Sequence, residues 1–307
     1  MFKRYIVILC VLLGIVGLVV ACEPLADPPA LPTPVINTVA PVFEPSPEIT
    51  PTDLPPQLPL AAKVDGAGIL LSEYERELAS YRASFAETDA IPSDAEMRET
   101  VLNFLIEQQL LVNAAHQNGF TLSDQALDEK IQNLSNEIGG QDALNTWMQN
   151  NQHTPESLRQ SLRLAAEAAW QRDQIIAQVP DTAEQVRARQ IFTIYQGDAI
   201  NAERSLAGGT DFEQIAWRYS PESGGELGWF PRGFLLFPEI EEAAFSLPVG
   251  ATSQIIQTEL GYHILYIIAH EDAHPLTTDA RVMLQNKALQ AWLNTAREQA
   301  EIEILIP

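Results

Sequence analysis

Cysteine is almost absent from this sequence: its 307 residues include two, Cys10 and Cys22. Both lie within the first 22 positions, which excludes a disulfide framework or a cysteine metal site from the rest of the chain. Lysine and arginine are also scarce. They number 18 against 41 aspartates and glutamates, a formal net charge of −23, and they form no basic stripe. Because neutralising phosphates requires clustered cations, nucleic-acid binding is not expected.

Long hydrophobic runs are lacking too, apart from one at residues 5–20. A multi-pass membrane fold is therefore excluded, since each spanning helix needs about 20 apolar residues. The hydrophobic content of 46% is nevertheless too high for a wholly disordered chain. The residues beyond position 60 are enough for one or two domains with a proper core.

The N-terminus resembles a bacterial lipoprotein signal peptide. Lys3 and Arg4 precede the apolar run, which ends at residues 19–22 in the lipobox-like string Val-Val-Ala-Cys. The resemblance implies that residues 1–21 are removed and that Cys22 is lipidated, which anchors the chain to a bacterial membrane outside the cytoplasm. The alternative is an uncleaved membrane helix, which leaves the remaining chain on the same side.

Proline is concentrated behind this signal, with 12 of the 21 prolines at residues 23–60. Such a segment forms neither a helix nor a central strand, so residues 22–60 are predicted to be an extended, disordered linker. A proline-motif ligand for a partner is the alternative. A tether of this composition needs no partner.

Residues 61–181 have the sequence signals of helices. Two capping boxes, in which a serine is followed three positions later by glutamate, begin at Ser72 and Ser93. Apolar residues recur at helical spacing after each of them. The predicted helices cover about 72–85, 94–118, 123–138 and 154–179.

Residues 182–274 mix strand and helix signals, and the helical period returns after Pro275. The predicted strands lie near 187–195, 253–257 and 262–269, and the predicted helices near 199–206, 211–219 and 238–246. A glycine-rich turn is expected at 224–228, and the tail at 301–306 alternates like a strand. This order predicts an α+β module inserted in, or appended to, an all-helical one.

Two stretches resemble known families. Residues 64–120 look like the N-terminal chaperone region of the SurA and PrsA foldases, through helical pattern more than through motifs. Residues 187–264 are similar to the parvulin-type peptidyl-prolyl isomerases, with several motifs in the right order. The motifs include Arg187-Ala188-Arg189-Gln190-Ile191, Gly209-Thr210-Asp211-Phe212, Gly224-Gly225-Glu226-Leu227-Gly228-Trp229-Phe230, Ala243-Ala244-Phe245 and Gly261-Tyr262-His263-Ile264.

The resemblance implies an α+β fold in which a parvulin-like domain, a small four-stranded antiparallel sheet flanked by helices, is inserted between segments of an all-helical SurA/PrsA-like chaperone domain. A closing strand at 302–306 is expected to pair near residues 61–64. The implied domains are a signal peptide at 1–21, a linker at 22–60, a helical chaperone part at 61–181, the isomerase domain at 182–274, and a helix and strand at 275–307 that complete the chaperone domain.

The parvulin resemblance also implies an active site, with His263 on the last strand, Thr258 beside it and Gln190 where the family has a histidine. A glutamine can hydrogen-bond an imidazole but cannot titrate. Glu222 lies in a shortened loop, near the position where the family has aspartate or cysteine. The pocket for the proline ring is expected to consist of Leu227, Leu235, Phe237 and Ile240, although an extra residue near 237–240 shifts the match between the last two.

Each of these residues has a plainer interpretation. His263 could be a hydrogen-bonded core histidine, and on spacing alone this reading is favoured. Glu222 could be a solvated loop acid. The four apolar residues are, by type, more often core than pocket.

Two motifs suggest chemistry that their context contradicts. His270-Glu271-Asp272-Ala273-His274 matches the zinc-protease string, but it follows a predicted strand, and His274 precedes a proline, which disfavours a helix. Residues 224–228 are glycine-rich but lack the lysine and following helix of a phosphate loop. Neither a metal nor a cofactor is expected.

The resulting hypothesis is a lipid-anchored peptidyl-prolyl isomerase that acts on unfolded or partly folded, proline-containing polypeptides outside the cytoplasm. The alternative is a holdase chaperone whose parvulin module is weak or inactive, which Gln190 and the shortened loop favour. A third interpretation, a structural tether, has only the linker in its support. The sequence does not predict the client proteins, the residue preferred before proline or the oligomeric state.

Overall fold

The computed structural model describes residues 58–86 and 91–306. The chain forms two compact units. Unit 1 contains the described residues up to Gln109, then Phe120–Glu167 and the residues from Ala300 onward, and unit 2 contains Leu110–Gly119 and Ala168–Gln299. Within the described ranges, no helix is both long and apolar enough to cross a membrane. The proposed signal peptide, Cys22 and the predicted linker up to residue 57 lie outside these ranges. The predicted end of the linker at residue 60 is one residue too late, because strand β1 begins at Leu60.

Unit 1 contains a three-stranded antiparallel sheet in the order β2-β1-β7. Strands β1 (Leu60–Val64) and β2 (Ala67–Leu70) form a hairpin whose turn residues, Asp65 and Gly66, have φ values of 50° and 81°. Asp-Gly is a preferred pair for such a turn. Strand β7 (Ile302–Ile304) pairs with β1 through Ala62 and Ile304, which confirms the expected pairing of the tail. The expected all-helical domain therefore also contains a small sheet.

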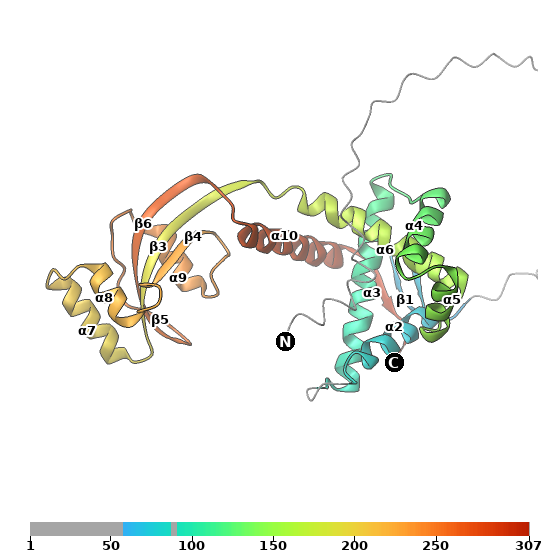
Figure 1. Ribbon diagram of the computed structural model, residues 1–307, viewed down its shortest axis with the longest axis horizontal. Helices are drawn as coiled ribbons and strands as arrows, with labels where there is room; N and C mark the ends of the chain where they lie inside the picture. Colours follow the sequence, from blue (N-terminus) through green and yellow to red (C-terminus); the bar gives the residue numbers. More distant parts are fainter. Residues whose placement is uncertain (1–57, 87–90, 307) are drawn as a thin grey trace, which may run out of the picture. The chain divides into compact units, whose positions relative to one another are not determined.

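Five helices of the described chain, some of them shared with unit 2, belong to this region (Figure 1). They are α2 (Leu71–Ala83), α3 (Asp94–Gln117), α4 (Asp124–Glu137), α5 (Gln141–Asn150) and α6 (Pro155–Ile176). Leucines spaced along α4, α5 and the start of α6 bury against one another as a core, with Leu127 and Leu144 each 1% exposed.

The capping predictions differ in outcome. Ser93 and Glu96 form a capping box before α3: the Ser93 N–H donates to Glu96 Oε2 at 2.7 Å, and the Glu96 N–H donates to Ser93 Oγ at 3.3 Å. The capping box at Ser72 is wrong, because α2 already begins at Leu71, directly after β2, without a side-chain cap. Helix α5 was not expected, since it has no capping side chain and begins after Gly140.

Unit 2 is built on a four-stranded antiparallel sheet in the order β4-β3-β6-β5, which confirms the parvulin-like sheet (Figure 1). Its strands are β3 (Thr182–Thr193), β4 (Glu226–Pro231), β5 (Ile256–Thr258) and β6 (Gly261–Pro275). The helices are α7 (Gln196–Ala207), α8 (Phe212–Tyr219), α9 (Pro238–Ser246) and α10 (Thr278–Gln299). Of the segment 275–307, α10 lies in unit 2 and β7 in unit 1.

Alternation along the strands assigns each face of this sheet to different helices. Ile191 and Ile264 face α7 and α8, where they pack with Ile215 and other buried residues. Ala188 and Leu265 face α9 and pack with its Ile240 and with neighbouring buried residues. Gln190 and His263 follow the second pattern, two positions along their strands from Ala188 and Leu265, and therefore lie on the α9 face.

The sequence did not reveal β4, because its first half reads as the end of a glycine-rich turn. The zinc-protease string lies on β6 and is not helical. There His270 Nε2 contacts Glu184 at 2.9 Å, and His274 Nδ1 contacts Glu271 at 2.8 Å. Each of these histidines therefore contacts an acidic side chain in the strand region.

Candidate active site

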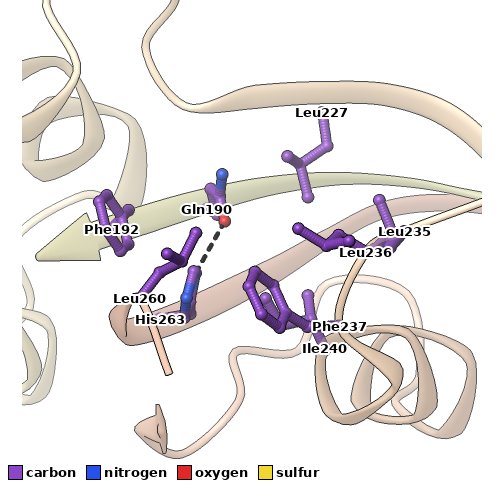
Figure 2. Close-up of a pocket in the computed structure, with 9 residues that line it drawn as sticks. All are labelled: Gln190, Phe192, Leu227, Leu235, Leu236, Phe237, Ile240, Leu260 and His263. Atoms are coloured by element: carbon purple, nitrogen blue, oxygen red, sulfur yellow. Dashed lines mark hydrogen bonds between the residues drawn. The ribbon is translucent and has the colours of Figure 1, made fainter. Parts of the chain in front are cut away.

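A pocket of about 260 Å³ opens on the α9 face of the unit 2 sheet. Its lining comes from strands β3, β4 and β6, from α9 and the segment that leads into it, and from the turn between β5 and β6 (Figure 2). It is a hollow with apolar walls and two polar side chains, the composition typical of small binding sites. Its lining residues are Gln190, Phe192, Leu227, Leu235, Leu236, Phe237, Ile240, Leu260 and His263.

His263 is the buried polar group of this pocket, with 4% of its surface exposed. It lies on β6 between two neighbouring strands, with its Cα opposite that of Phe192 on β3 and of Ile256 on β5. Aromatic rings flank the imidazole, with centroids 4.9 Å away for Phe192 and 6.2 Å away for Phe237. The ring is therefore held firmly by its surroundings.

Two side chains hold the imidazole by hydrogen bonds. Its Nδ1 lies 3.1 Å from Gln190 Oε1, and its Nε2 lies 2.9 Å from Thr258 Oγ1 (Figure 2 shows the first contact). A carbonyl oxygen only accepts, so Nδ1–H donates to Gln190 Oε1, while Nε2 and the Thr258 hydroxyl form the second hydrogen bond. Both ring nitrogens are therefore used within the protein, with a proton on Nδ1.

Burial lowers the pKa of His263, because the apolar surroundings disfavour the charged imidazolium. Neither of its hydrogen-bond partners is a carboxylate, whose negative charge would raise the pKa again. The surroundings of His263 therefore favour its neutral form.

The four residues expected to bind the proline ring lie together in the pocket: Leu227 on β4, Leu235 and Phe237 before α9, and Ile240 within α9 (Figure 2). Ile240 is 5% exposed, and the other three are half-buried against the same core. Phe237 and Ile240 both line the pocket, so the sequence did not need to choose between them.

Glu222 is not brought into this group. It is exposed in the turn between α8 and β4 and is absent from the pocket lining. Sequence reasoning also missed three lining residues. Phe192 could have been found from strand alternation with Gln190, whereas Leu236 and Leu260 lie in loops, where no periodicity marks them.

Gly225 fixes the position of Gln190. The Gln190 N–H donates to the Gly225 carbonyl at 2.8 Å, and Gly225 has a φ of 70°. A Cβ at this position would lie 1.9 Å from the Gln190 carbonyl oxygen. Only glycine permits so close an approach. The glycine-rich turn therefore fixes the position of the β3 backbone at Gln190, the residue whose side chain reaches the pocket.

Comparison with known families agrees with this geometry. Residues 175–269 match the PPIC-type peptidyl-prolyl isomerase domain, and residues 49–169 match the SurA-like N-terminal domain. The chain therefore has a parvulin-type domain that follows a SurA-like domain, as the sequence resemblance predicted.

Two of the curated relatives are named foldase protein PrsA. The chain is 32% identical over 184 residues to the foldase protein PrsA of Caldanaerobacter subterraneus, an alignment covering 55% of this chain and 56% of that protein. It is 26% identical over 222 residues to PrsA of a Geobacillus strain, covering 69% and 78%. The crystal structure of the peptidylprolyl isomerase PrsA from Bacillus cereus matches with 21% identity and a TM-score of 0.46, over 75% of this chain and 86% of that one.

Proposed function

We propose that this protein is a peptidyl-prolyl cis-trans isomerase that assists the folding of exported proteins outside the cytoplasm. The observation that supports this most directly is the apolar pocket with its buried, neutral His263 held between Gln190 and Thr258. The names of the foldase relatives support the same role.

The reaction needs binding and orientation, without a covalent intermediate or a cofactor. Rotation about an X–Pro bond crosses a barrier of about 18–20 kcal/mol, because the amide loses its resonance in the twisted state. Contacts that are stronger in the twisted state than in the planar one lower that barrier, and about 1.4 kcal/mol of such stabilisation gives a tenfold rate.

The pocket residues have complementary roles in this proposal. Leu227, Phe237 and Ile240 bind the pyrrolidine ring and keep water away from it, which favours a twisted amide whose carbonyl dipole is smaller. His263 forms a rigid floor, and Gln190 and Thr258 hold its orientation. The substrates are unfolded or partly folded polypeptides that contain proline.

An isomerisation assay on a short X–Pro peptide tests the proposal. Residues 58–307 should be used, because β1 begins at Leu60. We expect catalysis above background, and at least about a tenfold lower kcat/KM for His263→Ala, since its loss removes the floor of the pocket. Circular dichroism should show that the variant keeps its fold. Background rates for the unsubstituted protein would contradict the isomerase function.

We further propose that Cys22 is lipidated and anchors the protein to a bacterial membrane. The lipobox-like string before it supports this. In cells fed a radiolabelled fatty acid, the label should appear in this protein. The Cys22→Ser variant should carry no label and should no longer sediment with the membranes. An unlabelled protein that still sediments with membranes would favour the uncleaved helix instead.

A holdase chaperone is the second candidate. It is favoured by the use of both His263 nitrogens within the protein and by the absence of Glu222 from the pocket lining, which leave neither of these two groups for the substrate. Thr182 and Pro275 pair with each other at one end of the β3–β6 ribbon, so residues 182–274 can be removed and the flanking residues joined. Suppression of client aggregation by this shortened protein, without isomerase activity in the full protein, would support the holdase.

A further inference from the structure

We propose that an exposed apolar rim beside the pocket selects prolines that are flanked by large apolar residues. The rim consists of Leu236, Leu260 and Ile194. This inference rests on the proposed isomerase function and adds the substrate class to it.

The two rim leucines differ from the other pocket residues in their exposure. Leu236 is 79% exposed and Leu260 is 57% exposed, although both line the pocket. Figure 2 shows them towards different ends of the hollow, Leu260 near Phe192 and Leu236 near Leu235. A proline ring bound between them therefore places its neighbouring residues against these leucines. Burying the leucines under an apolar side chain is favourable, because it removes apolar surface from water.

Ile194 extends the rim beyond Leu260. It is 66% exposed and lies in the bend directly after β3, which ends at Thr193. Thr193 pairs with Tyr262, and a Cβ built on Gly261 would lie 3.3 Å from the Ile194 Cα. The backbone of Ile194 therefore lies beside Gly261, the neighbour of Leu260, and adds a third exposed apolar residue at this end of the pocket.

The charges near the rim argue against acidic or phosphorylated substrates. Residues 190–192, 235–240 and 258–263, all within the described chain, contain no lysine or arginine but include the exposed Glu239 and Glu259. The arginine next to Gln190 in sequence, Arg189, is paired with Glu213 at 3.0 Å and with Glu226 at 3.3 Å. An anionic residue beside the proline would lie near apolar surface and carboxylates. Repulsion between the like charges would weaken the binding of such a peptide.

A peptide series measures this preference. The peptides share an Ala-Pro-Ala centre and replace either neighbour of the proline by leucine, glutamate or phosphoserine. For each peptide, kcat/KM for isomerisation and Kd from fluorescence anisotropy are measured with the purified full chain. We expect leucine on either side to exceed glutamate and phosphoserine by about five- to tenfold in both quantities, about the gain from removing one or two methylenes from water.

Variants assign the preference to the rim. Leu236→Ser and Leu260→Ser should reduce the ratio between leucine and glutamate peptides to about twofold or less, whereas Leu260→Met should retain it. A loss of structure lowers all peptides alike and leaves this ratio unchanged. Val249→Ser is the matched control, because Val249 is also 57% exposed in unit 2 but is not part of the pocket.

The outcomes separate this inference from the proposed function. If isomerisation stays at the background rate while Kd is lower for the leucine peptides, the isomerase function is contradicted and the substrate preference of the rim is supported. If the protein isomerises all peptides without a preference for leucine, or if the serine variants keep the wild-type ratio, the proposed preference of the rim is wrong and the isomerase function still holds.

Discussion

His263 and its two hydrogen-bond partners, Gln190 and Thr258, form a hydrogen-bonded row of three groups. His263 was predicted from its motif, and Gln190 was predicted to hydrogen-bond it. Glu222 shows the limit of motif transfer, because a loop whose length departs from the family pattern cannot be aligned residue by residue. Its involvement in catalysis stays a prediction. The rim leucines were missed because exposed loop leucines have no periodicity.

Gly225 and Gly228 provide a matched pair of substitutions at the same turn. Their φ values are 70° and 71°, but a Cβ at Gly225 would meet the Gln190 carbonyl, whereas nothing lies within 4 Å of one at Gly228. Gly228→Ala should cost about 1–2 kcal/mol of unfolding free energy from backbone conformation alone. We expect Gly225→Ala to cost clearly more and to lower kcat/KM, because it displaces Gln190. Urea unfolding measures both, and equal losses would contradict the close approach.

His153, in unit 1, should make stability depend on pH. Desolvation, with a smaller contribution from the charge of Arg76, lowers its pKa to about 4, and its ring stacks on Trp147 at 5.3 Å. Between pH 6.5 and 4 the unfolded chain binds this proton and the folded chain does not, so stability falls as pH falls.

The measurement compares urea midpoints at pH 7 and pH 5 for the wild type and for His153→Phe, which keeps an aromatic ring against Trp147. The variant should lose less stability on acidification than the wild type does. Other titrating groups contribute equally to both proteins and cancel in the comparison. An identical loss would show that His153 takes up its proton in the folded state.

At the scale of elements, the sequence predicted those with strong local signals. Ser93 and Glu96 marked the start of α3, Pro238 marked α9, and the apolar alternation of 262–269 marked β6. The missed elements have weak signals of their own. Strand β4 contains Gly228 and ends in proline, and it is held by its pairing with β3. Such strands depend on a partner that is distant in sequence, which periodicity does not reveal.

The C-terminal strand gives a test at this scale. Backbone bonds join it to β1 and its turn, from the Asp65 N–H to the Glu301 carbonyl and from the Leu305 N–H to the Ala61 carbonyl, each at 2.9 Å. Removing residues 300–307 should raise amide exchange in β1 and at Asp65 by about tenfold or more, because β1 then keeps only one of its two neighbouring strands. Hydrogen exchange with mass spectrometry measures this, and the amides of β3 serve as an internal control. Unchanged protection would contradict the pairing.

At the scale of the whole molecule, charge is the dominant property. Aspartates and glutamates exceed lysines and arginines by 23. We expect the protein without its lipid to stay off anionic vesicles even at low ionic strength, because acidic headgroups repel it. Vesicle co-sedimentation at increasing salt measures this. Strong binding at low salt that is lost at high salt would reveal a cationic surface that the composition conceals.

The buried imidazole has a consequence for the proposed role outside the cytoplasm. The pH outside the cell membrane varies more than the pH of the cytoplasm, which the cell holds nearly constant. Burial lowers the pKa of His263, and the amide and hydroxyl that hold it do not ionise, so this imidazole takes up a proton at a lower pH than an exposed histidine does. The proposed binding of a proline ring is therefore less sensitive to acidification than it would be at a site built on exposed histidines.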